Sequence, residues 1–293
     1  MDENLRRRLT LGPVLLAVLG GVLALDAWLE QQHAVKGIGI LALLLLMVPL
    51  ANLELARLFT ARNATPFKLI ASLGGAAIVL HAFFTQFDWF KPIAASVLAF
   101  LMAAVPLASA LRKVASRQVE EAITSMAGTL LAVMYLGGLA WFLMAIRVKE
   151  GGAVRADPIF DGSTTHIVMV LLCVKFTDIG AFFTGKSIGK RKLIAWLSPG
   201  KTWEGLVGGL VVAAAVGAAC APWLPEVEWW TGLIFGAVFG AVGQAGDLLE
   251  SLMKRDAAVK DSGQSLPGFG GVLDVIDSPL VAAPVAYLLF SLA

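Results

Sequence analysis

The sequence predicts an all-α, polytopic integral membrane protein with about nine transmembrane helices. Mean hydropathy is +0.80 and only 15% of the 293 residues are charged, whereas about a quarter of residues are charged in soluble domains. The third observation is a succession of apolar runs of roughly 20 residues, the length that crosses a bilayer as a helix. These runs lie at residues 11–29, 38–53, 68–84, 92–111, 123–146, 166–185, 205–224, 231–249 and 272–293.

The first five runs read as a scaffold. The first follows Arg6, Arg7 and Arg8 and resembles a signal peptide, but because many further runs follow, a retained helix is the better interpretation. The second and third runs are short for a crossing. All five runs carry few polar residues, and most polar residues of this half lie in the loops between the runs. The last four runs differ in this respect.

The loop charges predict an orientation. Most of the 23 lysines and arginines fall in loops on the side of the N-terminus, and cytoplasmic loops collect such residues. We therefore expect a cytoplasmic N-terminus. His33, His81 and His166 fall on the opposite side, so histidine chemistry is not expected at a cytoplasmic site. The net charge of +2 is too small to indicate a nucleic-acid partner.

Polar chemistry gathers between residues 175 and 278. This distribution predicts two parts, an N-terminal transmembrane scaffold at residues 1–165 and a C-terminal catalytic part at residues 166–293 with a polar funnel that faces the cytoplasm. Within an otherwise apolar chain, residues 246–278 combine acidic and basic side chains. Such a mixture suits a polyphosphate held through a divalent cation, because carboxylates bind the ion and cations bind the remaining phosphate charge.

The acidic residues of this stretch recur in helical register. Asp247 and Glu250 lie one turn apart at the end of the eighth run, and Lys254 follows on nearly the same face. Asp274 and Asp277 share a face at the start of the last run, near the positive end of that helix. Two carboxylates from the last helix and one from the preceding helix predict a magnesium site. The turn-rich residues 262–271 between the helices permit a close backbone approach to a ligand.

Lys175 and Asp178 are charged residues within the sixth run. Charge inside a span is costly and usually faces a cavity or a partner, and a separation of three places both residues on one face. We expect them to line a polar cavity open to the cytoplasm, with a structural ion pair as the alternative.

Two short motifs precede the seventh run. Residues 180–187, GAFFTGKS, fit the phosphate-loop pattern, but that motif requires a strand before it. We expect instead a helix that ends near Gly185 and a basic collar at the headgroups, although ordinary charge bias would also explain it. In residues 198–205, SPGKTWEG, Ser198 before Pro199 predicts a helix start that attracts anions, and Lys201 beside it would add a full positive charge. Because a cap alone would not need Lys201, Thr202 and Glu204 together, we expect a functional role for this stretch.

Glycines at four-residue spacing mark the eighth run. Gly232, Gly236 and Gly240 allow another helix to approach closely. The spacing predicts helix packing, with contact inside the chain and contact between subunits both open.

Taken together, the motifs resemble those of the phosphatidate cytidylyltransferase family, also called CDP-diacylglycerol synthases. The similarity covers most of residues 175–290 and includes the stretches DIGAF, SPGKTWEG and GDLLES. The family pattern S-x-x-K-R-x-x-x-x-K-D-x-G, then P-G-H-G-G and D-R-x-D, is matched by Ser251, Lys254, Arg255, Lys260, Asp261, Gly263, Pro267, Gly268, Gly270, Gly271, Asp274 and Asp277.

The resemblance implies transfer of CMP from CTP to phosphatidic acid, with magnesium as cofactor and a second, monovalent cation left open. The resemblance also implies a homodimer. We expect a bacterial inner membrane, with the active site toward the cytoplasm as the loop charges predict. Asp247 and Asp274 are expected as the principal metal ligands, with Asp277 beside them, and these three as the catalytic residues. The substrate-binding residues expected are Lys201, Thr202, Lys254, Arg255, Lys260, Asp261, Asp178 and Ser251.

Two positions depart from the family pattern. Phe269 stands in place of the usual histidine and Val275 in place of the usual arginine. Two side chains that could donate hydrogen bonds to phosphate are therefore absent. We hypothesise that Lys175 supplies the missing charge, an idea that unchanged turnover in Lys175→Met would exclude. Two other functions stay open at this stage, a membrane transporter and an inactive cytidylyltransferase-like scaffold.

Overall fold

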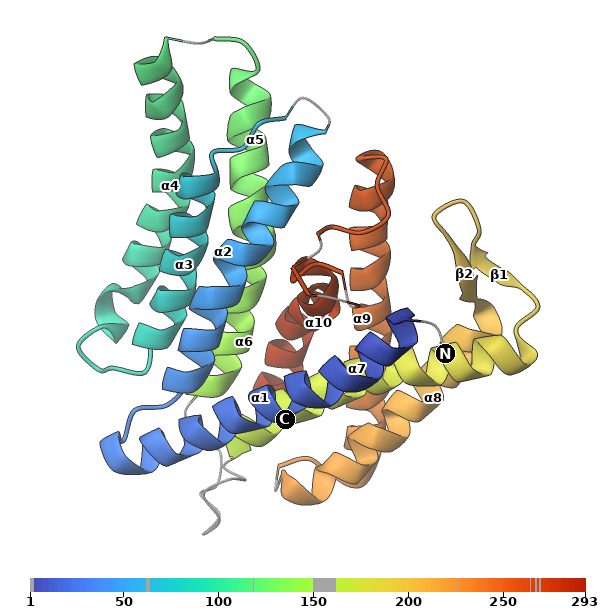
Figure 1. Cartoon of the computed structure of the whole chain (residues 1–293). Helices are drawn as coiled ribbons and strands as arrows, with labels where there is room; N and C mark the ends of the chain where they lie inside the picture. Colours follow the sequence, from blue (N-terminus) through green and yellow to red (C-terminus); the bar gives the residue numbers. More distant parts are fainter. Residues whose placement is uncertain are drawn as a thin grey trace. The chain divides into compact units, whose positions relative to one another are not determined.

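The computed structural model describes residues 3–61, 64–117, 119–149, 162–224, 226–263, 265–266, 268 and 270–293. Over this part of the chain helices dominate and the sheet is limited to one short hairpin (Figure 1), which confirms the all-α class. The elements are α1 (Glu3–His33), α2 (Ile38–Thr60), α3 (Lys68–Phe84), α4 (Lys91–Ser116), α5 (Ala122–Ala132), a π-helical turn (Val133–Gly138), α6 (Leu139–Val148), α7 (Gly162–Ile188), β1 (Lys192–Ile194), β2 (Ser198–Thr202), α8 (Trp203–Cys220), a 3₁₀ turn (Ala221–Trp223), α9 (Trp229–Asp256) and α10 (Leu273–Leu292).

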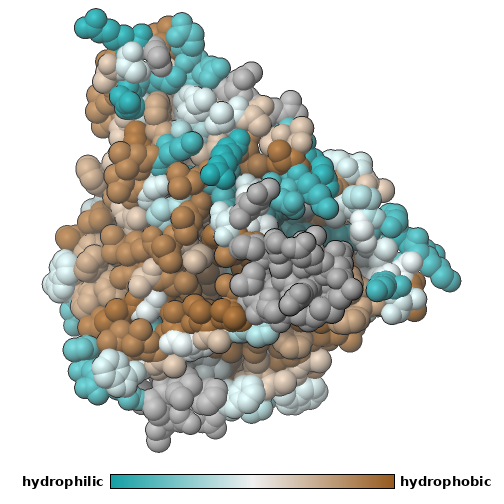
Figure 2. Space-filling view, viewed as in Figure 1, coloured by the Kyte–Doolittle hydropathy of each residue, from teal (hydrophilic) through white to brown (hydrophobic). Residues whose placement is uncertain are grey.

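The helices agree with the predicted spans. Among the described residues, eight helical stretches are long and apolar enough to cross a membrane, and the third predicted span, Lys68–Phe84, is a shorter apolar helix of 17 residues. Large apolar side chains such as Leu69, Phe100 and Val114 are exposed, and apolar residues cover broad areas of the face in Figure 2. A surface of this kind suits lipid rather than water.

The chain packs into two compact units. One comprises Met1–Val148 with Asp256–Val275, and the other comprises Lys149–Arg255 with Ile276–Ala293. The segment that joins α9 to α10 thus belongs with the N-terminal helices. The predicted division at residue 165 concerns function, which this packing does not test.

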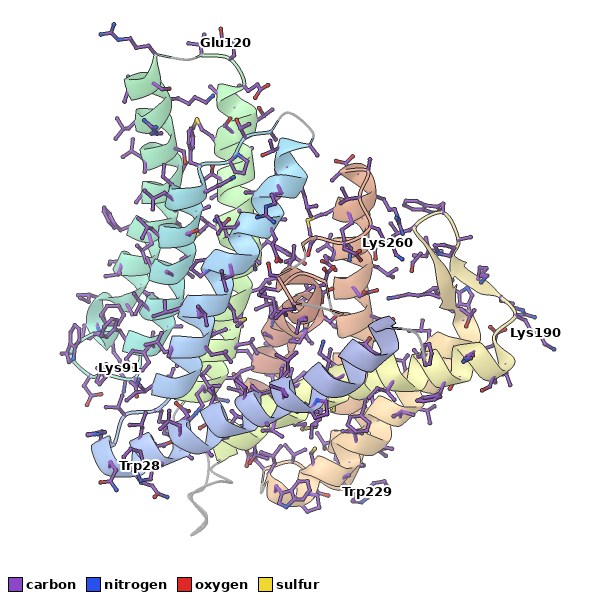
Figure 3. All side chains as sticks on the ribbon, in the orientation of Figure 1. Trp28, Lys91, Glu120, Lys190, Trp229 and Lys260 are labelled. Atoms are coloured by element: carbon purple, nitrogen blue, oxygen red, sulfur yellow. The ribbon has the colours of Figure 1, made fainter. Side chains whose placement is uncertain are left out.

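The first unit is built around helices α2 to α6, which run alongside one another (Figure 1). Lys91 is the first residue of α4, and Glu120 lies in the connection from α4 to α5. The two residues lie at opposite ends of α4 (Figure 3). The backbones of α3 and the π-helical turn meet at Gly75 and Gly137, where a Cβ on Gly75 would lie 3.6 Å from the Gly137 Cα. Small residues at a crossing point allow this close contact.

Helix α1 is tied to the bundle by buried charge. The fully buried Arg147 of α6 contacts Asp26 through its Nε at 2.6 Å and Glu30 through a terminal nitrogen at 2.5 Å. Asp26 also accepts a hydrogen bond of 2.6 Å from the Gly39 amide. Since a buried charge is stable only when it is paired, these contacts fix α1 against α2 and α6.

In the second unit, small residues bring α8 close to both α7 and α9. A Cβ on Gly205 of α8 would lie 2.9 Å from the Ala181 carbonyl of α7. On the other face, a Cβ on Gly232 of α9 would lie 2.6 Å from the Gly217 carbonyl. The glycine stripe of α9 therefore has a partner inside the chain, which resolves one of the two alternatives left open by its spacing.

The phosphate-loop pattern does not form a loop. Residues 180–187 lie inside α7, which continues to Ile188, so the expectation of a helix is confirmed and its end lies three residues beyond the predicted Gly185. Lys186 is exposed, with its ammonium 5.8 Å from the ring of Phe182. A continuous helix offers no free amides to cradle phosphate.

The predicted helix start at Ser198 is wrong. Ser198–Thr202 forms β2, which pairs with β1 in an antiparallel hairpin, and proline is tolerated there because both strands are edge strands. Helix α8 begins at Trp203, and the hydroxyl of Thr202 caps it by accepting a hydrogen bond of 3.1 Å from the Gly205 amide. Glu204 closes the hairpin by accepting hydrogen bonds from the backbone amides of Lys190 and Arg191.

Candidate functional site

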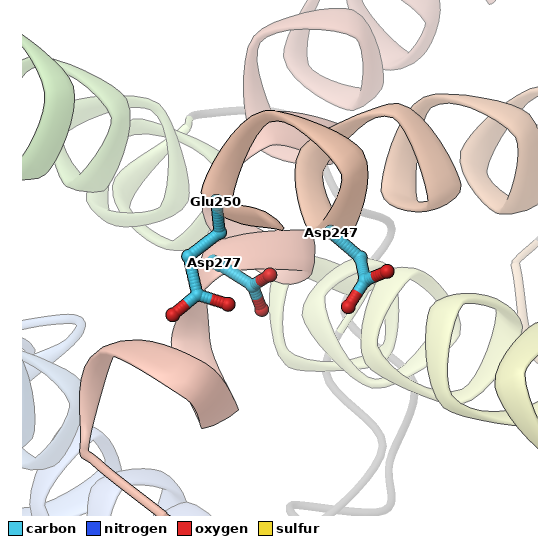
Figure 4. A group of neighbouring side chains, drawn as sticks. All are labelled: Asp247, Glu250 and Asp277. Carbon is cyan, nitrogen blue, oxygen red and sulfur yellow. The ribbon is translucent and has the colours of Figure 1, made fainter. Parts of the chain in front are cut away.

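Three carboxylates of the second unit gather where α9 and α10 meet. Asp247 and Glu250 leave the same face of α9, one turn apart, and Asp277 of α10 lies between them in Figure 4. Each offers an oxygen, and these atoms all lie within 4.8 Å of one another. Glu250 and Asp277 are only 1% and 2% exposed, so two of the three acids are withdrawn from solvent.

Gly246 makes this arrangement sterically feasible. It precedes Asp247 on α9 and faces Ser278, the residue after Asp277 on α10. A Cβ on Gly246 would lie 3.1 Å from the Ser278 Cα and 3.0 Å from the Val281 Cβ. Because glycine has no side chain, the two helix backbones approach closely beside the carboxylates.

The donor set fits a hard divalent cation. Mg²⁺ prefers oxygen ligands and is usually held by one or two carboxylates together with water and phosphate oxygens. The Oδ2 atom of Asp277 is buried and has no hydrogen-bond partner among the described residues. An orphaned buried oxygen is costly, and a bound cation would satisfy it.

Two lysines contact these acids. Lys201 of β2 forms an ion pair with Asp247, and its ammonium donates a hydrogen bond of 2.9 Å to Oε1 of Gln244. Lys254 contacts Glu250 at 2.8 Å. The cluster therefore places ammonium groups directly beside the candidate metal ligands, as recognition of a polyphosphate requires.

Gln244 connects the cluster to α7. Its Nε2 donates a hydrogen bond of 2.6 Å to Oδ1 of Asp178, while its Oε1 accepts from Lys201, and the side chain is buried. A network thus runs from Asp178 through Gln244 and Lys201 to Asp247. Lys175 lies one turn before Asp178 on α7 and is half-buried. The polar cavity predicted at these two residues stays a prediction.

The other predicted substrate residues of this unit lie nearby in the chain but have separate contacts. Arg255 is exposed, and its Nε donates a hydrogen bond of 3.3 Å to the Leu197 carbonyl of the hairpin turn. Ser251 is half-buried on α9. Thr202 is buried as the cap of α8. Their roles toward a substrate stay predictions.

Asp274, Lys260 and Asp261 belong to the first unit, and Asp274 is not a member of the three-carboxylate group. Its Oδ2 accepts hydrogen bonds from the Gly271 amide at 2.6 Å and from the Ser262 hydroxyl at 2.9 Å. Through these hydrogen bonds Asp274 stabilises the segment before α10. Asp274 itself precedes Asp277 by about one helical turn. Lys260, labelled in Figure 3, and Asp261 are exposed in that segment.

Sequence reasoning missed two residues of this site and one residue of the first unit. Glu250 was recognised as an acid beside Asp247 but not assigned as a ligand, although its register with Asp247 gave the signal. Gln244 precedes Asp247 by three positions on the same face, in an otherwise apolar stretch. Glu54, a lone acid directly after the second apolar run and inside helix α2, gave the clearest unused signal, because charge in a span requires partners. Of the two family departures, Val275 is half-buried on α10 and Phe269 lies outside the described residues.

Comparison with known proteins agrees with these features. A family model described as the cytidylyltransferase family matches residues 14–293. The chain is 37% identical over 161 residues to the uncharacterized protein YnbB of Escherichia coli strain K12, covering 55% of this chain and 50% of that protein. It is 38% identical over 164 residues to a phosphatidate cytidylyltransferase of Brucella suis biovar 1 (strain 1330), covering 54% and 60%. It is 39% identical over 167 residues to a phosphatidate cytidylyltransferase of Bacillus subtilis (strain 168), covering 55% and 57%.

These alignments span between half and three fifths of the length of the curated relatives. The family match is more extensive, because it includes the N-terminal helices as well as α9, α10 and the three carboxylates between them. The chain belongs to the cytidylyltransferase family.

Proposed function

We propose that the protein transfers CMP from CTP to phosphatidic acid, which yields CDP-diacylglycerol and pyrophosphate. The observation that carries this proposal is the meeting of Asp247, Glu250 and Asp277 beside Lys201 and Lys254 in a membrane chain of this family. Carboxylates and ammonium groups in contact suit a nucleoside triphosphate bound with a divalent cation.

The reaction needs no general base from the protein. A phosphate monoester has a second pKa of about 6, so the lipid phosphate is largely dianionic at neutral pH. One of its oxygens attacks the α-phosphorus of CTP and forms a new P–O bond. The bond between the α-phosphorus and the bridging oxygen of the β-phosphate breaks, and pyrophosphate leaves with that electron pair. Catalysis is then a matter of positioning and electrostatic stabilisation.

Asp247, Glu250 and Asp277 would hold Mg²⁺, which when bound neutralises phosphate charge in reactions of this type. Lys201 and Lys254 would bind phosphate oxygens next to those carboxylates, since both ammonium groups already lie there. Gln244 and Asp178 would orient Lys201, because the hydrogen-bonded network leaves its ammonium a fixed direction. Lys260, Asp261 and Asp274 join this proposal on the family resemblance alone.

The substrates account for the membrane location. One is a lipid whose phosphate stays at the headgroups, and the other is soluble in the cytosol. We propose a bacterial inner membrane and a site that opens to the cytoplasm. The bacterial relatives and the positive charge of the loops on one side support this orientation.

The proposal is tested with purified protein, Mg²⁺, phosphatidic acid and CTP labelled at either the α- or the γ-phosphate. We expect the α-label in the lipid extract and the γ-label in aqueous pyrophosphate, in equal amounts. Transfer of the γ-label to lipid would indicate a lipid kinase instead. Absence of both labels from lipid, with a folded protein, would refute the proposed transfer.

A further inference from the structure

Glu54 is a buried carboxylate within the apolar helix α2 of the first unit. Only 2% of the residue is exposed, and the 23-residue helix around it is long and apolar enough to span a membrane. An ionisable side chain at such a place is costly unless specific donors compensate it. The donors that Glu54 has therefore indicate what it does.

Among the described residues, three groups donate hydrogen bonds to Glu54: two lie in the segment that precedes α10, and the third is the first residue of α10. Oε1 accepts from the Ser265 hydroxyl at 2.5 Å and from the Val272 amide at 3.1 Å. Oε2 accepts from the Leu273 amide at 2.9 Å. More than 200 residues of chain separate α2 from these donors, so the carboxylate links two distant parts of one unit.

Two glycines of the segment make room for the carboxylate. A Cβ on Gly263 would lie 2.6 Å from the Glu54 Oε1, and a Cβ on Gly271 would also overlap the Glu54 carboxylate. Real Cβ atoms do not approach this closely. The glycines of this stretch thus allow the backbone to close around Glu54.

The hydrogen bonds also define the start of α10. Leu273 is the first residue of that helix, and the first amides of a helix have no partner within it. Three consecutive amides donate to carboxylates: Gly271 to Asp274, and Val272 and Leu273 to Glu54. Negative charge at this position also favours the helix through its dipole.

We infer that Glu54 is a positioning residue that fixes the described residues of the segment at 262–273 and the first turn of α10, and through that turn the direction in which Asp274 and Asp277 leave the helix. Asp277 follows Leu273 by four residues, so a shift in the first turn moves it. The inference that Glu54 positions this segment depends only on the hydrogen bonds described above. Only its consequence for catalysis rests on the proposed function.

Hydrogen exchange of the full-length protein tests the placement without any activity. We expect peptides that cover residues 262–273 to exchange at least about tenfold faster in Glu54→Ala, because two charge-assisted amide bonds are lost. Glu54→Gln should fall between, since its amide nitrogen cannot accept. Asn52→Ala is the matched control: Asn52 is equally buried on α2, but its Nδ2 donates to Lys68 and Ser72 of α3.

CMP transfer tests the consequence. In Glu54→Ala we expect kcat to fall about 10- to 100-fold, as for other residues that orient ligands, with a higher Mg²⁺ requirement and little change in KM for CTP. Ser265→Ala, which removes one donor, should have a smaller effect in the same direction. Asn52→Ala should keep the Mg²⁺ requirement of the parent.

Unchanged exchange at 262–273 in Glu54→Ala, or equal acceleration in Asn52→Ala, would overturn the inference. An inactive parent protein whose Glu54→Ala variant exchanges faster would instead refute the proposed function and leave the placement intact. An active parent with normal exchange and normal turnover in Glu54→Ala would refute the inference alone.

Discussion

Asp277 and Lys201 are charged residues of this site that we expect to contribute to ligand binding more than to stability. Asp277 is 2% exposed and keeps one oxygen without a hydrogen-bond partner among the described residues. Lys201 contacts Asp247 and Gln244, so its charge is balanced on the protein side. Buried or paired charges of this kind add little to stability, and their value lies in what they can bind.

Replacing Lys201 by methionine removes the ammonium and keeps much of the side-chain length. We expect kcat/KM for CTP to fall about 10- to 100-fold, since a charge-assisted contact to phosphate is worth roughly 1.5–3 kcal/mol. Steady-state kinetics with varied CTP measures the change. Lys192→Met, at an exposed position on the neighbouring strand β1, is the matched control, and an equal loss in both variants would contradict a specific role for Lys201.

At the scale of elements, glycines determine how closely the helices pack. Gly246 brings α9 against α10, and Gly205 brings α8 against α7. The approach at Gly246 lies beside the carboxylates of α9 and α10. The helices themselves follow from apolar periodicity and length, which the sequence displays directly.

Gly246→Val tests this dependence. The added side chain would meet Ser278 and Val281 of α10, and overpacking of this kind costs about 1–3 kcal/mol. We expect a lower thermal unfolding temperature in detergent together with weaker activation by Mg²⁺. Ala245→Val, at an exposed position one residue earlier, should preserve both properties. Equal unfolding temperatures and equal Mg²⁺ activation in the two variants would contradict a role for the close helix approach at Gly246.

The predictable and unpredictable parts of the structure differ in their physical basis. Apolar runs predicted the helices, because each span must satisfy its own backbone hydrogen bonds. Ser198 misled as a helix start, since the pairing of β2 with β1 is a tertiary contact that local capping preferences do not reveal. The register of Asp247 and Asp277 indicated carboxylates on facing helices. The partners of Glu54 lie more than 200 residues away, and no local pattern predicts such contacts.

At the scale of the whole molecule, orientation in the membrane decides whether CTP can reach the site. Trp196 in the hairpin turn and Trp89 in the segment between α3 and α4 are 75% and 65% exposed. The loop charges predict that these two residues lie on opposite sides of the membrane. The homodimer expected from the family resemblance stays a prediction. The glycine stripe of α9 packs against α8 within the chain.

Cysteine labelling tests this orientation. In a background where the buried Cys173 and Cys220 are replaced by alanine, we expect Trp89→Cys to react with an impermeant maleimide on intact spheroplasts. Trp196→Cys should react only after the membrane is permeabilised. Labelling of Trp196→Cys in intact spheroplasts would reverse the predicted orientation and place the site on the wrong side for cytosolic CTP.

The most direct test of the account is the Mg²⁺ dependence of CMP transfer to phosphatidic acid by the parent protein and by Asp277→Asn. The substitution keeps the size of the side chain and removes the buried charge. We expect a loss of more than about 100-fold, beyond the range for residues that only orient ligands, and no rescue by added Mg²⁺. Glu228→Gln, an exposed acid of the same unit, should match the parent. An Asp277→Asn variant with the Mg²⁺ activation and turnover of the parent would contradict the central claim.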